Sequence, residues 1–488
     1  MIQESAFWQA YRRFLNASLV TETPHPQTVA LSDWARQDLL KAFKCLAQLD
    51  LHVLNQVNLQ GTRISALQQA CKRCMDQGGR VVLVGCGASG RIAAQIEHDW
   101  RLTAADPDRL ISLLAGGDVA LIESVEASED HPDYAIAQLK SIHLEDRDLV
   151  IALSAGGESP FILGALHYAK IHTESPPWFL YCNPDAALLK RNSQHPVGQR
   201  GFALFNLEVG PMALTGSTRM QATTAMTFVL MQALFPKSFN AARWQQFYTK
   251  FDWSKLLALT EWESACYQQH CAVIYQAPAA LALPVLADMT ERAPTFNLPP
   301  FPNQQDAHPP LWNYMLLTDV PHGEEAAWKA ILLRAPRSLN RRIHGFDLSQ
   351  HSLVFLESLE RPLAFLTISH QVSGIHFHFG EDPVLHLPLP GLNLLERQFF
   401  LRLLLVNHST LMMGRLGYYQ GNLMTHLKPS NFKLIDRAIR YVLFLAEHRH
   451  KQQLSYEKVA HVLFTVLPQL QPEESIVLKS LKIVLQLP

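Results

Sequence analysis

Four short apolar runs, each ending in a turn rich in glycine, serine or asparagine, constrain the fold of this chain most strongly. They are VVLVG at 81–85, LISLLAGG at 110–117, LVIALSAGG at 149–157 and WFLYCNP at 178–184. Segments with helical periodicity separate them, and this alternation predicts a parallel, doubly wound sheet with helices on both faces. Ligands of such sheets bind at the carboxyl ends of the strands, so the residues after each run are candidates for a site.

The rest of the chain indicates a second α/β region and a helical end. A length of 488 residues exceeds one core of ordinary size. Residues 253–387 again alternate between strand and helix patterns, but without a glycine- and serine-rich turn. The strands expected there are LVFLES (353–358), LAFLTIS (363–369) and GIHFHFG (374–380). The proline-rich stretch 295–312 is expected to form a long surface loop, and helical patterns continue from Leu392 onward.

Upstream of the first strand, helices are expected at about 35–57 and 64–77. The N-terminal MIQESAFWQAYRRFLNAS mixes both charges on a helical period and is predicted to be an amphipathic helix rather than a signal peptide. The most apolar stretch, 399–413, is broken by polar residues and falls short of a span of about 20 apolar residues. No membrane segment is expected.

Composition gives no sign of a charged macromolecular partner. The 42 basic and 43 acidic residues leave a formal net charge of -1, which does not favour nucleic acid or an anionic membrane. The 7 cysteines do not form a disulfide framework, which fits a reducing compartment and a cytoplasmic location. Cys71 and Cys74 lack a second pair at metal-ligand spacing, and His376 and His378 alternate with apolar residues as in a half-buried strand. No metal site is expected.

Gly85, Gly87 and Gly90 in GCGASGR form a G-x-G-x-x-G pattern between a strand and a helix that is expected from about Arg91. Glycines there let the backbone approach a ligand, and the N–H groups at the helix start attract an anion. A dinucleotide fold uses the same spacing with an acidic residue after the next strand, a place that Asp118 takes here. A nicotinamide-dependent oxidoreductase therefore stays open as an alternative.

Hydroxyl groups favour a phosphate ligand over a dinucleotide. Ser89 lies in the first loop, Ser154 ends the third run, and Ser217 and Thr218 lie in LTGSTRMQATTA, directly before another helix. A hydroxyl donates a hydrogen bond to a phosphate oxygen without a counter-charge, so three such loops at one sheet edge predict a compact phosphate cradle. The alternative is that these residues are ordinary helix caps.

Six motifs in this order resemble the sugar isomerase (SIS) domain family, in the branch that contains N-acetylmuramate-6-phosphate etherases and the glucokinase regulatory protein. The motifs are GCGASGR, AGGDVALIESVEASED, LSAGGESPFILGAL, CNPDAAL, VGPMALTGSTRM and GNLMTHLKPSNFKLIDRA. The resemblance implies an α/β fold with two doubly wound, parallel-sheet SIS-type lobes and an all-helical C-terminal cap. The expected parts are 1–45 (N-terminal helical segment and connector), 46–250 (first SIS domain, phosphosugar-binding), 251–390 (second, degenerate SIS domain) and 391–488 (cap).

The resemblance also implies a sugar-phosphate site that needs no cofactor. Glu129 falls on the family's ED motif and would accept hydrogen bonds from sugar hydroxyls, with Glu126 as the second choice. Lys433 in SNFKL would reach into the site from the cap. The residues expected to bind the substrate are Gly87, Ala88, Ser89, Glu126, Glu129, Ser154, Ala155, Gly156, Ser159, Ser217, Thr218 and Lys433.

Two departures from the etherases concern the activity. Etherases carry a catalytic glutamate in an SECPPT-like segment ten residues after the loop serine; here Asp99, in IEHDWRLT, takes that position without the cysteine and the two prolines. An acid one methylene shorter is displaced by about 1 Å, which can cost about a hundredfold in rate. Gly156 stands where etherases place a serine, and about 200 residues separate VGPMALTGSTRM from GNLMTHL, enough for a second lobe as in the regulatory protein.

We therefore favour a sugar-phosphate sensor that binds a phosphorylated hexose such as a fructose phosphate. The alternative is an N-acetylmuramic acid 6-phosphate etherase that releases D-lactate, with Asp99 as the catalytic residue. A sugar kinase is the candidate partner, although the helical end is shorter than in the regulatory protein. Two lobes in one chain resemble a dimer and would permit a monomer.

Overall fold

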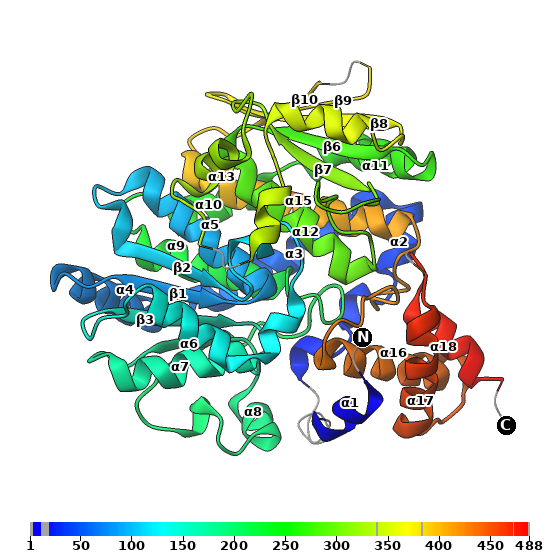
Figure 1. The fold of residues 1–488 in the computed structure, drawn as a ribbon, viewed down its shortest axis with the longest axis horizontal. Coiled ribbons are helices and arrows are strands. Elements are labelled where there is room, and N and C mark those ends of the chain that lie inside the picture. Colours follow the sequence, from blue (N-terminus) through cyan, green and yellow to red (C-terminus); the bar gives the residue numbers. More distant parts are fainter. Residues whose placement is uncertain (1–2, 11–18, 338–339, 382–383, 472, 487–488) are drawn as a thin grey trace.

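The computed structural model describes residues 3–10, 19–337, 340–381, 384–471 and 473–486. It contains two five-stranded sheets, each packed with helices, and a separate group of helices near the C-terminus (Figure 1). Among the described residues, no helix combines the length and the apolar content that a membrane span requires.

The first sheet is entirely parallel, with the strand order β2-β1-β3-β4-β5. Its strands are β1 (Val81–Gly85), β2 (Leu110–Leu114), β3 (Leu149–Ser154), β4 (Trp178–Tyr181) and β5 (Ala203–Asn206). The four strands predicted from the apolar runs are confirmed. In β1, Val81 and Leu83 pack toward one face and Val82 and Val84 toward the other, and helices cover both faces. Gly85 pairs with Leu114 on one side and Leu153 on the other, so the carboxyl ends of β2, β1 and β3 lie level.

The helices of the first lobe follow the predicted pattern with shifted ends. They are α2 (Leu31–Gln37), α3 (Leu39–Asn58), α4 (Gly61–Asp76), α5 (Gly87–Thr103), α6 (Pro132–Ser141), α7 (Pro160–His172), α8 (Asp185–Arg191), α9 (Gln221–Leu234) and α10 (Ala241–Lys250). The run predicted as one helix at 35–57 is interrupted at Asp38, whose carboxylate caps α3 by accepting from the Lys41 N–H. Helix α5 begins at Gly87, before the predicted start at Arg91, and a Cβ on Gly90 would clash with the Leu114 side chain.

The second sheet has the order β7-β6-β8-β9-β10. Its strands are therefore arranged in the same order as those of the first sheet, with β6 in the place of β1 and β7 in the place of β2. Its strands are β6 (Ala272–Ala277), β7 (Asn313–Leu317), β8 (Leu363–Gln371), β9 (Gly374–Phe379) and β10 (Val384–Pro388). The fully parallel sheet expected here is wrong, because β8 pairs antiparallel with β9, and β9 with β10. The connection between β8 and β9, Val372 and Ser373, is a short turn, whereas parallel strands need a long crossover.

Two further expectations for the second lobe need correction. Its helices are α11 (Leu257–Gln268), α12 (Ala282–Phe296), α13 (Glu324–Leu332) and α14 (Leu353–Glu357). LVFLES was expected to be a strand but contains α14, in which Leu356 is buried and Val354 exposed; a short apolar run does not distinguish strand from helix. The segment expected as a surface loop at 295–312 continues α12 and then buries Leu298 and Phe301, so only part of it lies at the surface.

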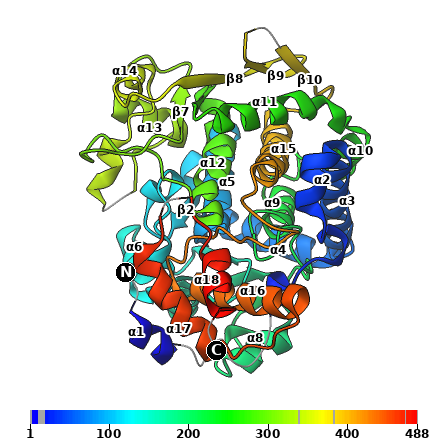
Figure 2. The same cartoon turned by 90° about the vertical axis from the view of Figure 1, so that its right-hand side faces the viewer.

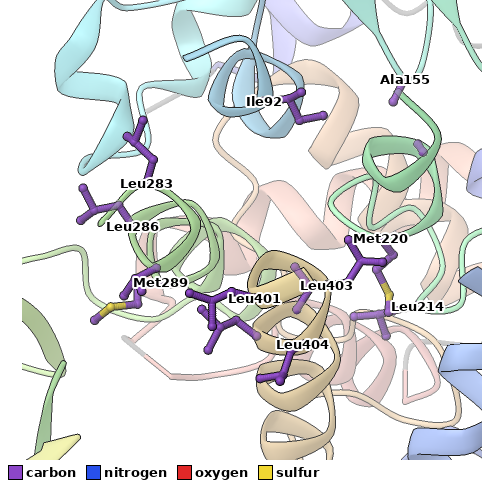
Figure 3. Close-up of a cluster of buried hydrophobic side chains, with 14 of the residues drawn as sticks. Ile92, Ala155, Leu214, Met220, Leu283, Leu286, Met289, Leu401, Leu403 and Leu404 are labelled. Atoms are coloured by element: carbon purple, nitrogen blue, oxygen red, sulfur yellow. The ribbon is translucent and has the colours of Figure 1, made fainter. Parts of the chain in front are cut away.

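Helix α15 (Leu394–Arg415) packs between the two lobes, against α2, α3, α11 and α12. Figure 3 shows Leu401, Leu403 and Leu404 of α15 in one buried cluster with Met220 and Met289. Burying one such side chain stabilises the fold by roughly 1.5–3 kcal/mol, so α15 is a main connection between the lobes. The C-terminal cap that was predicted from the sequence, residues 391–488, included this helix.

The helices that stand apart from both sheets are α16 (Phe432–His450), α17 (Tyr456–Val466) and α18 (Ile476–Val484). They pack on one another beside the carboxyl ends of the first sheet (Figure 2). The N-terminal helix α1 (Glu4–Ala10) lies against them, and the remaining residues of the predicted N-terminal helix lie outside the described part of the chain. We call α16, α17 and α18 the cap.

Candidate functional site

A cavity of about 120 Å³ lies where the loops after β1 and β3 meet the start of α9 and the cap. The parallel register explains the position, because it brings the ends of neighbouring strands to one edge of the sheet. The predicted residues that line it are Gly87, Ala88, Ser89, Glu129, Ser154, Ala155, Gly156, Ser159, Ser217, Thr218 and Lys433.

Three serine hydroxyls on this edge have hydrogen-bonding capacity to spare. The Ser217 Oγ is buried and has no partner among the described residues. The Ser89 Oγ donates to the Met226 thioether, a weak acceptor, at 3.8 Å. The Ser154 Oγ accepts from the Gly157 N–H at 3.0 Å, which leaves its proton available. Buried polar groups normally have hydrogen-bond partners. Available donors that face one cavity therefore indicate a ligand with several acceptors.

Backbone groups add to these donors. Gly87, Ala88 and Ser89 form the first turn of α5, where N–H groups have no partner within the helix and the helix dipole favours an anion. Gly87 has a φ of 50°, and a Cβ there would lie 3.0 Å from Glu129 Oε1. Glycine at position 87 therefore allows both the sharp turn and the close approach of the carboxylate. Hydroxyls and amides together form a donor-rich end of the cavity, suited to a phosphate group.

The cavity also carries charged side chains, and Glu129 lies beside its donor-rich end. The Lys433 Nζ, from the first turn of α16, lies 3.2 Å from Glu129 Oε2. Glu129 belongs to the short helix η6 (Glu126–Asp130), and the Ser159 hydroxyl donates to its backbone carbonyl at 3.2 Å. The side chain of Glu126 lies outside the described part of the chain. The structure thus brings residues more than 300 positions apart to one pocket.

The second lobe and the connector contribute residues to the cavity that were not predicted from the sequence. Glu291, on α12, lines it and forms an ion pair with Arg91 of α5. At the mouth, Arg437 of the cap pairs with Glu22 at 2.6 Å. No local pattern marks Glu22 or Glu291, since each reaches the cavity only through tertiary packing.

Glu158 also lines the cavity, and its position inside the LSAGGESP motif was a signal that could have identified it. Its carboxylate lies 2.5 Å from Arg191 Nε. Burial raises the pKa of Glu158 to about 7 despite the nearby charge of Arg191. Glu158 further lines a second cavity of about 390 Å³ that shares Lys433 and Arg437 with the first. The site therefore contains one carboxyl group that titrates near neutral pH.

Asp99 does not line the cavity. It follows Ser89 by ten residues on α5, which corresponds to about 15 Å along a helix. Helix α5 continues through Asp99 to Thr103 because no proline interrupts it. Both carboxylate oxygens are buried without a hydrogen-bond partner among the described residues, and burial raises the pKa of Asp99 well above its usual range.

Asp99→Asn is expected to stabilise the protein at pH 7 and to leave its stability near pH 4 unchanged. Between these pH values the unfolded chain releases the Asp99 proton while the folded chain keeps it, so wild-type stability falls as pH rises, by up to about 1.4 kcal/mol per pH unit. Asparagine has no such proton. Urea unfolding at both pH values measures the effect, with Asp76→Asn on the surface as the control. Equal pH dependence of wild type and Asp99→Asn would contradict an uncharged, buried Asp99.

Comparisons with known proteins agree with this geometry. The family profile described as "Glucokinase regulatory protein N-terminal SIS domain" matches residues 63–170. N-acetylmuramic acid 6-phosphate etherase from Salmonella agona is 32% identical over 214 residues, which are 44% of this chain and 68% of the relative. The etherase from Staphylococcus epidermidis is 34% identical over 217 residues, 43% of this chain and 68% of the relative.

Among solved structures, tagatose-6-phosphate ketose/aldose isomerase from Escherichia coli aligns with 83% of this chain and 99% of its own, at 13% identity and a TM-score of 0.46. The family assignment depends on the sequence matches and on the glycine- and serine-rich loops that line the cavity. The chain belongs to the sugar isomerase (SIS) domain family, in the branch of the glucokinase regulatory protein and the N-acetylmuramic acid 6-phosphate etherases.

Proposed function

We propose that this chain is a sugar-phosphate-binding regulatory protein, similar to the glucokinase regulatory protein, that holds a phosphorylated hexose such as a fructose phosphate in the cavity of the first lobe. The proposal depends on one observation: the hydroxyls of Ser89, Ser154 and Ser217, which are available to donate hydrogen bonds, line a single cavity. The oxygens of a phosphate group can accept hydrogen bonds from all three hydroxyls. Glu129 and Lys433, which also line the cavity, have groups that can bond sugar hydroxyls.

The position of Asp99 supports a binding protein over a lyase. Removal of lactate requires a carboxylate that abstracts a proton from the sugar, and such a base must come within hydrogen-bonding distance of it. Asp99 lies outside the cavity, on a helix without the prolines of the etherase segment.

An etherase remains the second candidate, because Glu158 supplies a suitable acid or base. A pKa of about 7 is the value at which a carboxyl group transfers protons most effectively at neutral pH. Curated relatives named etherases are 32–34% identical to this chain over 214–217 residues. In this reading Glu158, rather than Asp99, is the residue to test.

Titration with fructose 6-phosphate, fructose 1-phosphate and N-acetylmuramate 6-phosphate distinguishes the two functions. We expect at least one fructose phosphate to raise the melting temperature, whereas fructose, which lacks the phosphate, does not. We expect no lactate from N-acetylmuramate 6-phosphate. Catalytic lactate release that Glu158→Gln abolishes would establish the etherase instead, and no thermal protection by any of the three phosphosugars would refute a phosphosugar site.

The same proposal extends to assembly and partners. The two sheets share one strand order, and Glu291 of the second lobe completes the cavity of the first. We propose that the two lobes form an internal pseudo-dimer, so that a monomer has a complete site. A sugar kinase is the partner that such a regulator would control.

A further inference from the structure

Helix α1 packs on the cap through aromatic rings. Phe7 is fully buried, with its ring centroid 5.6 Å from that of Phe464 on α17 and 6.3 Å from that of Phe432 on α16. Its neighbour Trp8 lies edge to face with Tyr456, at 6.3 Å. These ring contacts hold α1 against the cap and equally support the cap.

Phe432 is the first residue of α16, and the next residue is Lys433. The same turn supplies Asn431, Lys433 and Leu434 to the wall of the cavity. Asn431 caps the helix by accepting from the Leu434 N–H at 2.9 Å. Because successive side chains on a helix have a fixed angular spacing, a ring that fixes Phe432 also fixes the direction from which Lys433 enters the cavity.

The position of Lys433 depends on this turn more than on its own packing. The Lys433 side chain is 45% exposed, so its neighbours do not hold it by burial. Two other contacts of α16 lie further along the helix, where Arg437 pairs with Glu22 of the connector and the Tyr441 hydroxyl donates to the Thr215 carbonyl of the first lobe at 2.6 Å. Helix ends open more readily than helix centres. The contact with Phe7 therefore restrains the first turn of α16, which is the turn most prone to open.

We propose that Phe7 is a positioning residue for Lys433, and that the N-terminal helix thereby sets the affinity of the cavity for its ligand. The proposal rests on the proposed function of the cavity as a phosphosugar site. Without the Phe7 ring, the first turn of α16 samples other positions, and Lys433 faces the ligand in only a fraction of the molecules. The dissociation constant is therefore multiplied by the inverse of that fraction.

Calorimetric titration of the full chain with fructose 6-phosphate tests this. Phe7→Ala is expected to raise the dissociation constant about fivefold to tenfold, as for a competent fraction of about one tenth to one fifth. Phe7→Leu, which keeps an apolar contact, is expected to recover most of the affinity. Phe432→Ala removes the same contact from the other side and serves if Phe7→Ala does not fold. Wild-type affinity in folded Phe7→Ala, or in folded Phe432→Ala used in its place, would overturn the proposal.

A double-mutant cycle separates positioning from general destabilisation. Lys433→Ala is expected to weaken binding, and Phe7→Ala added to it is expected to change the affinity by less than about twofold, because coupled residues are not additive. Equal losses from Phe7→Ala in both backgrounds would overturn the proposal. Phe346→Ala removes an equally buried ring in the second lobe and should leave the affinity unchanged. If wild type binds no hexose phosphate, the proposed function fails; if Lys433→Ala weakens binding but Phe7→Ala does not, only the positioning role fails.

Discussion

Glu97→Gln is expected to lower the free energy of unfolding by about 3–5 kcal/mol, as is usual when one partner of a buried ion pair is removed. Glu97 lies on α5, and its carboxylate accepts from Arg334 at 3.0 Å and from Arg337 at 2.8 Å, both on the segment that follows α13 in the second lobe. The Ser112 hydroxyl also donates to it, at 2.5 Å. A neutral amide leaves Arg334 and Arg337 with Asp118 as the nearby carboxylate, and it also removes the ion pair that Arg101 forms with Glu97. Urea unfolding followed by circular dichroism measures the loss.

The same carboxylate makes stability depend on pH in the acid range. Burial alone would raise the pKa of Glu97, but the charges of Arg334 and Arg337 outweigh it and lower the pKa from 4.5 to about 2. A lowered pKa in the folded state means that the stabilisation is complete above about pH 4.5 and is lost as pH falls through about 2. Glu97→Gln should lack this contribution, so wild type and variant should converge in stability at low pH.

Glu145→Gln is the matched control for Glu97→Gln. Glu145 pairs with Arg147 at 2.7 Å, but both side chains are about half exposed. Pairs at the surface contribute about 0–1 kcal/mol, so this variant should remain close to wild type. A similarly small effect at Glu97 would show that the ion pairs between the lobes do not stabilise the fold.

Ser89→Ala combined with Ser217→Ala is expected to weaken the binding of fructose 6-phosphate by at least about a hundredfold. A hydrogen bond to a charged group contributes about 1.5–3 kcal/mol, and the variant removes two of them. The free protein should lose little stability, because the Ser217 Oγ has no partner among the described residues and the Ser89 Oγ donates to a thioether, a weak acceptor. Calorimetric titration and thermal unfolding of the same preparation report both quantities.

Ser141→Ala is the control for this pair of substitutions. Its hydroxyl donates to the Gln138 carbonyl on α6, away from the cavity, so its loss should not change the affinity. Unchanged binding in the double variant, with wild-type stability, would show that the two hydroxyls do not contact the phosphate. A variant that loses stability and affinity together would instead point to a structural role for these serines.

The parts of the site that could be predicted from sequence are those in which one short segment carries both the structure and the chemistry. Ser89 and Ser154 follow directly after buried strands, and the order of the strands alone brings them to one edge. Lys433 is too far along the chain for such reasoning, and only the family resemblance identified it. Glu291 belongs to an ordinary helical pattern, and its place in the cavity depends on how α12 packs on α5.

The strands of the two lobes likewise differ in how far they could be predicted from the sequence. The strands of the first lobe are uniformly apolar because both faces are covered, so they were recognisable. In the second lobe, His376 and His378 alternate with buried residues, as predicted, because helices cover only one face of β9. The direction of β9 relative to β8 follows from the length of the connection. The four residues between the expected strands 363–369 and 374–380 are too few for a parallel crossover, so the antiparallel pairing could have been predicted.

The ion pair between Arg91 and Glu291 joins two lobes that are covalently connected. The effective concentration of one lobe at the other is therefore set by the chain, and dilution of the protein does not separate them. A contact held in this way does not require identical lobes: one lobe can lose its glycine-rich turn, as the loop after β6 illustrates, while it still supplies a side chain to its neighbour. Tethering thus allows the two halves to change sequence independently.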